Sequence, residues 1–242
     1  MNTIKLHAPR VKMVAHRGLS GLERENTCAA FLAAANRSYY GIETDVHKTA
    51  DGKFVVIHDE TLTRVSLGAV TTNVETATYA EFANVVLPDL DGSDFRRDLQ
   101  VPLLAEYISI CKKYEKICVL ELKNAFSAED IEKMLAEIRG LDYLDGVTFI
   151  SFDWQNCVTL RALLPQANIQ FLTGESVTAE MIANLRENRM DLDIYYRRLT
   201  KAAVEELHAA GILVNCWTCD DLADAEALVA MGVDMITSNI LE

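Results

Sequence analysis

Eight short apolar runs recur along the chain, and they constrain its fold more than any other feature. Most of these runs are continuous rather than alternating with polar residues, a pattern typical of strands buried on both faces of a parallel sheet. Helical stretches lie between them. The expected strands are residues 11–16, 42–48, 117–122, 147–151, 168–172, 192–195, 212–217 and 234–237.

Eight strand–helix steps in a chain of 242 residues predict an α/β fold, a TIM (β/α)8 barrel in which residues 1–242 form a single domain. Side chains that can cap a helix and glycines that can end one support the helices between the strands. The expected starts are Asn26 or Thr27, Ser127, Ser176 and Thr200, and the expected ends are Gly140, Gly211 and Gly232.

Two segments depart from the regular repeat. Residues 49–53 are too few for a parallel crossover, so residues 54–57 are expected to return antiparallel to the strand at 42–48. Residues 59–100 lack clear periodicity and are interpreted as a small inserted subdomain with a short helix around residues 78–85. The chain ends just past the eighth strand, which leaves no length for a full closing helix. Either residues 1–10 or another subunit of a homo-oligomer would cover the seam.

Composition and charge exclude several classes of protein. Half of the residues are apolar and the formal net charge is −13, so the chain can bury a full core but repels nucleic-acid phosphates and anionic membrane surfaces. No apolar run approaches the roughly 20 residues that span a bilayer, and the N-terminus does not resemble a secretory signal. We therefore expect a cytoplasmic protein with no membrane span and no nucleic-acid partner. The six dispersed cysteines indicate reduced thiols, and the pair Cys216 and Cys219 is interpreted as packing.

Three carboxylates are expected to meet at the top of the barrel. Glu43 and Asp45 lie two residues apart on one expected strand and therefore share a face, and Glu121 lies near the end of the next expected parallel strand. Three hard oxygen ligands suit Mg²⁺ or Ca²⁺, with Mn²⁺ as a third candidate. The alternative is that each acid forms an ion pair with a neighbour, such as Glu121 with Lys123.

Two histidines are expected beside these carboxylates. His16 ends the first strand, and His58 ends the returning arm, where it comes level with Glu43 and Asp45. A single histidine is more often a core or surface residue. Two at strand ends beside a carboxylate cluster favour a general acid and a general base.

Several neighbouring side chains have two interpretations each. Arg17 offers a permanently charged fork for phosphate oxygens, or forms a salt bridge with Glu25. Asn26 either caps the following helix or donates its amide to a ligand. His47 shares a strand face with the two acids but is not needed as a ligand. Trp217, at the rim, either packs or forms a pocket wall.

Taken in order, these motifs resemble the glycerophosphodiester phosphodiesterase family. Each motif alone is a weak signal, but the ordered set spans nearly the whole chain and is specific. The matching stretches are His16-Arg17-Gly18, Glu25-Asn26-Thr27, Glu43-Thr44-Asp45-Val46, Thr49-Ala50-Asp51-Gly52, Val56-Ile57-His58-Asp59, Val101-Pro102-Leu103-Leu104, Leu120-Glu121-Leu122-Lys123, Ser151-Phe152-Asp153 and Val214-Asn215-Cys216-Trp217-Thr218.

The resemblance implies a TIM barrel that hydrolyses glycerophosphodiesters, as small-molecule substrates, to sn-glycerol 3-phosphate and an alcohol. It also implies roles for the candidate residues: a divalent cation at Glu43, Asp45 and Glu121, acid/base catalysis by His16 and His58, phosphate contacts from Arg17 and Lys123, and a pocket wall at Trp217. The inserted residues 59–100 would cover the barrel mouth. The chain departs from the family pattern at Arg24, where proline is frequent, and at Thr237-Ser238-Asn239, where a Thr-Asp pair followed by proline is usual.

Two other functions fit the same sequence. One is a lysophospholipase D activity on lysophospholipids, which needs an apolar groove, with Val85, Val86, Leu87 and Phe95 as candidates. The other is a non-catalytic binding barrel, in which the acids and histidines only form internal ion pairs. The sequence leaves open the leaving alcohol, the metal, the number of subunits, and whether water or the substrate's own 2-hydroxyl is the nucleophile.

Overall fold

The structure, a computed structural model, describes residues 2–242 and contains the expected closed barrel of eight parallel strands. Strand β9 pairs with β1, which closes the ring, and every expected strand is present to within two residues. In ring order the strands are β1 (Lys12–Ala15), β2 (Gly41–Lys48), β4 (Ile117–Leu122), β5 (Val147–Ser151), β6 (Asn168–Thr173), β7 (Asp191–Tyr195), β8 (Val214–Trp217) and β9 (Met235–Ser238).

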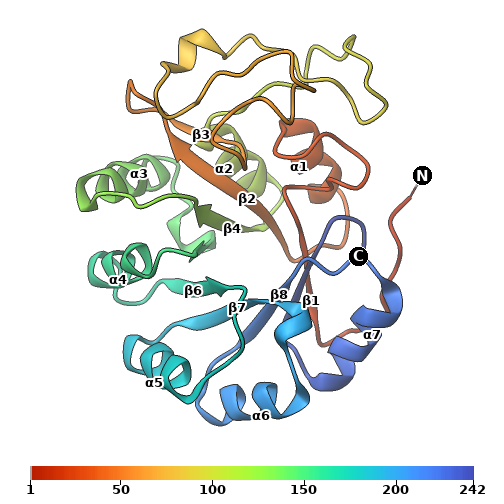
Figure 1. The fold of residues 1–242 in the computed structure, drawn as a ribbon, viewed down its shortest axis with the longest axis vertical. Helices are drawn as coiled ribbons and strands as arrows, with labels where there is room; N and C mark the ends of the chain where they lie inside the picture. The colour runs from red at the N-terminus through yellow and green to blue at the C-terminus, as the bar shows by residue number, and fades with distance from the viewer. Residues whose placement is uncertain (1) are drawn as a thin grey trace.

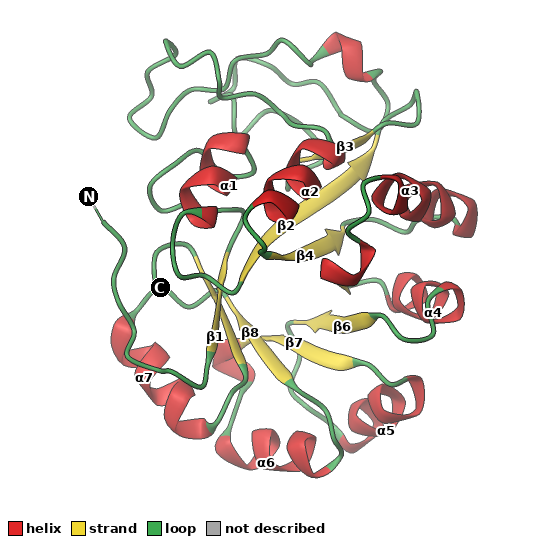
Figure 2. Ribbon diagram, turned by 180° about the vertical axis from the view of Figure 1, so that it is seen from behind, coloured by secondary structure: helices red, strands yellow, loops and turns green. Residues whose placement is uncertain are grey.

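Helices surround the strands (Figures 1 and 2). The helices are α1 (Cys28–Ala35), α2 (Leu104–Lys113), α3 (Ala128–Gly140), α4 (Trp154–Leu163), α5 (Ala179–Asn188), α6 (Lys201–Ala209) and α7 (Leu222–Met231). The expected caps Thr27, Ser127 and Thr200 each accept a hydrogen bond from a first-turn N–H. The start expected at Ser176 is wrong, because Thr178 caps α5 instead. No helix in the described part of the chain has the length and apolarity needed to cross a membrane.

The returning arm is confirmed as an antiparallel strand. Strand β3 (Phe54–Val56) pairs with β2 so that Val46 lies opposite Val56. The arm carries Val55 and Ile57 into a second apolar cluster formed with residues of the 59–100 segment, among them Phe82 and Leu99. This segment therefore packs on the barrel through its own small core.

Residues 59–100 lie beside α1, α2 and β3 and form mostly loops (Figure 1). The helix expected around residues 78–85 is only a single 3-10 turn, Tyr79–Glu81. Phe82 alone is fully buried there, so no apolar stripe supports a longer helix. Arg24 donates to the backbone carbonyls of Pro88 and Asp89, at 2.6 and 2.8 Å, and so anchors the segment to the loop before α1.

The first residues of the described chain lie beside the last ones (Figure 1). Ile4 forms a parallel bridge with Leu241, and the carboxylate of Glu242 accepts hydrogen bonds from Thr3 and Ser38 and pairs with Lys5 at 2.7 Å. The sequence left two candidates for covering this part of the barrel, residues 1–10 or another subunit. In the structure, residues 3–5 lie against the C-terminal segment.

Candidate active site

Three buried carboxylates meet inside the upper barrel. Glu43 and Asp45 both point inward from β2, and Asp45 lies directly opposite Glu121 of β4 in the parallel register. Ligand oxygens of the three side chains lie within 4.8 Å of one another. This group is the one predicted from sequence, and the register of two adjacent strands creates it.

Buried negative charge in this cluster is only partly neutralised. Lys123 Nζ lies 2.8 Å from Glu121 Oε1 and 3.3 Å from Asp45 Oδ1, so the ion-pair alternative for Glu121 is present in the structure. Burial opposes ionisation of Asp45, but the charges of Lys123 and Arg17 outweigh it and lower its pKa. Burial, reinforced by Asp45, raises the pKa of Glu43 and Glu121.

The donor set fits a divalent cation. It consists of carboxylate oxygens, the hard ligands that such ions prefer. The raised pKa values of Glu43 and Glu121 show that these two acids lack enough nearby positive charge to favour their ionised forms. Glu43 accepts a 2.7 Å hydrogen bond from the backbone N–H of Arg17 and forms no ion pair within residues 2–242. A divalent ion would supply the missing charge.

The loop between β1 and α1 is shaped to hold these acids. Asn26 does not cap the helix: its Nδ2 donates to Asp45 Oδ2 at 2.8 Å, and its Oδ1 accepts from Thr44. Arg17 and Asn26 both have left-handed backbone conformations, with φ of 53° and 54°, which cost energy for side chains other than glycine. Gly18 is needed beside them, because its φ is 75° and a Cβ there would lie 2.7 Å from Ala30.

Hydrogen bonds from the loops after β8 and β9 determine which ring nitrogen of His16 carries the proton. Its Nδ1 lies 2.7 Å from Asn239 Oδ1, and Asn239 Nδ2 donates to Asp220 at 2.6 Å. Since the Asp220 carboxylate can only accept, Asn239 presents its oxygen to His16, so Nδ1 carries the proton and Nε2 keeps a free lone pair. Burial and the charge of Arg17 lower the pKa of His16 to about 4.

His58 lies near the carboxylates of Asp59 and Asp45. Its Nδ1 lies 2.6 Å from Asp59 Oδ1, and Arg64 pairs with both Asp59 and Glu25. Burial lowers the pKa of His58, while the carboxylates of Asp45 and Asp59 oppose that shift. Arg17 and Lys123 also lower the pKa of His58, and Asp59 is the carboxylate in direct contact with its ring.

His47 is not part of the carboxylate cluster although it shares the strand face. Its Nε2 donates to the backbone carbonyl of His58 at 3.1 Å, and its Nδ1 lies 2.7 Å from Glu75. Glu75 also accepts a hydrogen bond from Asn124, in the loop after β4. His47 thus connects the 59–100 segment to the arm that carries His58.

One pocket brings the expected residues together. The pocket is lined by His16, Arg17, His58, Lys123, Trp217 and the acids Glu43 and Glu121. Trp217 both packs and forms a wall, since its ring makes edge contacts with Phe152 at 5.6 Å between centroids, and Phe152 is half-exposed. Arg17 also forms the expected salt bridge with Glu25, at 2.8 Å.

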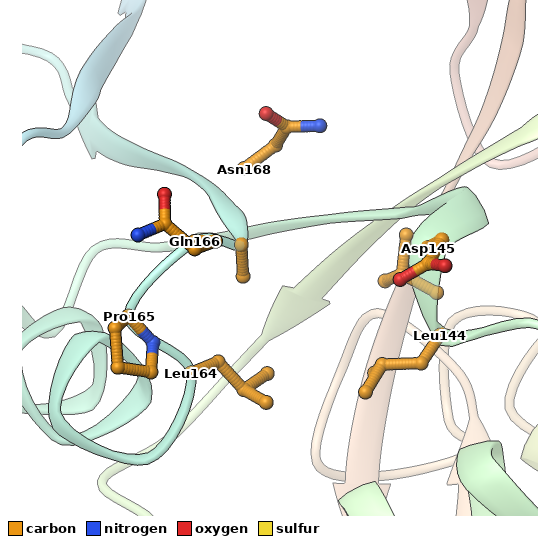
Figure 3. Close-up of a pocket in the computed structure, with 8 residues that line it drawn as sticks. Leu144, Asp145, Leu164, Pro165, Gln166 and Asn168 are labelled. Carbon is orange, nitrogen blue, oxygen red and sulfur yellow. The ribbon is translucent and has the colours of Figure 1, made fainter.

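The pocket shown in Figure 3 and the cysteines lack comparable chemistry. The pocket in Figure 3 lies where β5 and β6 begin, at the opposite end of the barrel, and Asp145 is its one ionisable side chain among the residues that line it. Cys216 and Cys219 are free and buried, and burial raises the pKa of both thiols. The interpretation of the pair as packing agrees with this burial.

Comparison with known proteins points to one family. Residues 16–242 match the Glycerophosphoryl diester phosphodiesterase family. A glycerophosphodiester phosphodiesterase of Caldanaerobacter subterraneus subsp. tengcongensis is 28% identical over 229 residues, 94% of this chain and 93% of that protein. One of Bacillus altitudinis is 29% identical over 236 residues, 93% of each chain.

Solved structures show the same architecture. A glycerophosphodiester phosphodiesterase from Parabacteroides distasonis has a TM-score of 0.79 at 26% identity and covers 95% of this chain and 93% of its own. An Oleispira antarctica phosphodiesterase, solved with the product sn-glycerol-3-phosphate, has a TM-score of 0.86 at 24% identity, with 98% and 96% covered. The likeness extends over the whole barrel.

Proposed function

The chain belongs to the glycerophosphoryl diester phosphodiesterase family and is a phosphoric diester hydrolase, and from this premise we propose that it hydrolyses glycerophosphodiesters to sn-glycerol 3-phosphate and an alcohol. Family membership sets aside the non-catalytic barrel. The observation that carries the proposal is the single pocket in which two histidines, two cations and an acidic cluster converge. The product bound to the Oleispira antarctica relative supports the substrate class. We treat residues 1–242 as one catalytic domain and residues 59–100 as its inserted subdomain.

Phosphate binding is assigned to the cations of the pocket. Arg17 and Lys123 lie beside the acidic cluster and would contact the non-bridging oxygens of the diester, which the net charge of the protein would otherwise repel. Glu43, Asp45 and Glu121 would hold a divalent cation, Mg²⁺ or Ca²⁺ in the first place. Such an ion, when bound, supplies Lewis-acid stabilisation of charge on the phosphoryl group.

The two histidines have different roles in this proposal. His16 accepts the proton of the nucleophile at Nε2, because its Nδ1 already carries a proton and donates to Asn239. His58, whose Nδ1 faces the carboxylate of Asp59, donates a proton to the leaving alcohol. Water and the substrate's own 2-hydroxyl are both candidate nucleophiles, and accumulation of a cyclic glycerol phosphate would identify the second.

The direct test is release of sn-glycerol 3-phosphate from a panel of diesters that includes glycerophosphocholine and glycerophosphoethanolamine. The protein is first treated with a chelator, and Mg²⁺, Ca²⁺ or Mn²⁺ is then added back separately. We expect release to return with at least one ion, and the preferred headgroup to identify the substrate. No release with any of the three ions would contradict the proposal.

Lysophospholipase D activity is the second candidate, and exposed apolar side chains on the inserted segment favour it. Phe95 is 74% exposed and Leu90 is 50% exposed. Of the residues expected to form an apolar groove, Leu87 is buried in the core of the segment and is not available. Headgroup release from lysophosphatidylcholine that exceeds release from glycerophosphocholine would favour this candidate.

Metal affinity is expected to rise with pH. Burial raises the pKa of Glu43 and Glu121, and a bound cation needs both side chains ionised, so binding must release protons. The stability of the metal-free fold changes in the opposite direction. An acid whose pKa is raised in the folded state makes the fold less stable as the pH increases through that pKa. Saturating Ca²⁺ should therefore raise the melting temperature more at about pH 8 than at about pH 6. Equal increases at both pH values would contradict this coupling.

A further inference from the structure

Asp193 is a buried acid that the mechanism above does not use. It lies in β7, is 2% exposed, and its Oδ1 has no hydrogen-bond partner within residues 2–242. A buried carboxyl group normally has a partner, because leaving it unpaired costs stability. Asp193 lines the same pocket as His16 and His58, so its side chain borders the space that a ligand would occupy.

The position of Asp193 places it across the pocket from the acidic cluster. Strand β7 is four strands from β2 in either direction around the ring, so the two strands lie on opposite sides of the barrel. Leu172 of β6 and Trp217 of β8, on the two strands beside β7, line the same pocket. This side of the pocket therefore combines the side chain of Leu172 and the ring of Trp217 with an unpaired carboxyl oxygen of Asp193.

A neighbouring acid on the same strand, in contrast, has a hydrogen-bond partner. Asp191 shares the strand face by parity, and its Oδ1 accepts a 2.8 Å hydrogen bond from the backbone N–H of Leu213. Burial, with a smaller effect of Glu121, raises the pKa of Asp193 well above the usual range. A neutral carboxyl group both donates and accepts hydrogen bonds, as an alcohol hydroxyl does.

We propose that Asp193 is a substrate-binding residue that forms a hydrogen bond with the terminal hydroxyl of the glycerol group. The inference rests on the proposed function. With the phosphate held between Arg17 and Lys123, the terminal hydroxyl is the glycerol oxygen farthest from phosphorus and so the one that extends across the pocket. About 60 Å³ of the pocket is open to water-sized groups, room for roughly four water molecules, which suits a small polyol.

Choline release from two esters tests this contact. One is glycerophosphocholine, and the other is the corresponding ester of 1,2-propanediol, which lacks only the terminal hydroxyl. We expect the wild-type protein to prefer the glycerol ester in kcat/KM, and Asp193→Leu to reduce that preference roughly ten-fold, the usual effect of losing one buried hydrogen-bond partner. Asp193→Asn keeps a donor and an acceptor and should retain most of the preference.

Asp191→Leu is the matched control on the same strand. It should leave the ratio of the two esters unchanged but lower the melting temperature, because it removes a paired carboxyl group, whereas Asp193→Leu should raise the melting temperature. An unchanged preference in Asp193→Leu, or a melting temperature lowered as in the control, would overturn the proposal.

Binding of sn-glycerol 3-phosphate, measured by calorimetry without turnover, separates this inference from the proposed function. Wild-type protein that hydrolyses neither ester would contradict the proposed function. Weaker binding of sn-glycerol 3-phosphate by Asp193→Leu, with unchanged binding of 1,2-propanediol phosphate, would still support the role of Asp193. Equal affinities of wild type and variant for both phosphates would overturn it.

Discussion

Replacing His16 or His58 with alanine is expected to lower kcat by at least ~10²-fold, the usual contribution of a positioned general acid or base. Both rings line the pocket, and each has its Nδ1 occupied by a partner, Asn239 for His16 and Asp59 for His58. His208→Ala is the matched control, since this histidine pairs with Asp234 away from the pocket. Turnover near the wild-type value in either pocket variant would refute the role of that histidine.

The leaving group distinguishes the two roles. A diester of 4-nitrophenol needs little protonation of its leaving oxygen, so His58→Ala should recover much of its activity on such a substrate. His16→Ala should remain impaired on it, because removal of the proton from the nucleophile is still required. Equal recovery in both variants would contradict the assignment of base to His16 and acid to His58.

Glu43→Gln is expected to weaken the affinity for the divalent cation at least ~10-fold and to lower activity at limiting metal accordingly. Asp45→Asn and Glu121→Gln should also weaken the affinity for the divalent cation. Glu129→Gln is the control, because Glu129 is exposed on α3 and forms an ion pair with Lys133, away from the acidic cluster. A metal titration midpoint unchanged in Glu43→Gln would count against Glu43 as a ligand.

Stability provides an independent measurement of the same site. Burial raises the pKa of Glu43, so its ionised form destabilises the metal-free fold. Neutral glutamine should therefore raise the melting temperature of the chelated protein while reducing the further increase produced by metal. A lower melting temperature without metal would indicate that the Glu43 carboxylate stabilises the fold through a pair of its own.

The barrel could be predicted because its determinants are local. Continuous apolar runs are long enough to form strands and are separated by stretches with helix caps, and the five residues between β2 and β3 permit only a hairpin. The same local reasoning was wrong at Ser176, where Thr178 competes for the cap two residues later. It also overestimated the helix at residues 78–85, where tertiary packing buries one side chain rather than a stripe.

Spacing alone also predicted the acidic cluster and the two histidines, because alternation along a strand and position at a strand end determine where these side chains point. Their partners could not be found this way. Asn239 reaches His16 across 223 residues of chain, and Glu75 reaches His47 across 28. No sequence period connects such pairs.

Apolar periodicity and chain connectivity were enough to predict the strand order, the faces of the strands and the types of residue that converge at one end of the barrel. The structure was needed to establish which nitrogen of His16 carries the proton, that His47 supports the arm of His58, and that Asp193 Oδ1 has no hydrogen-bond partner within residues 2–242. Hydrogen-bond pairing and burial depend on the distances between residues from distant strands, and these distances exist only once the barrel has closed.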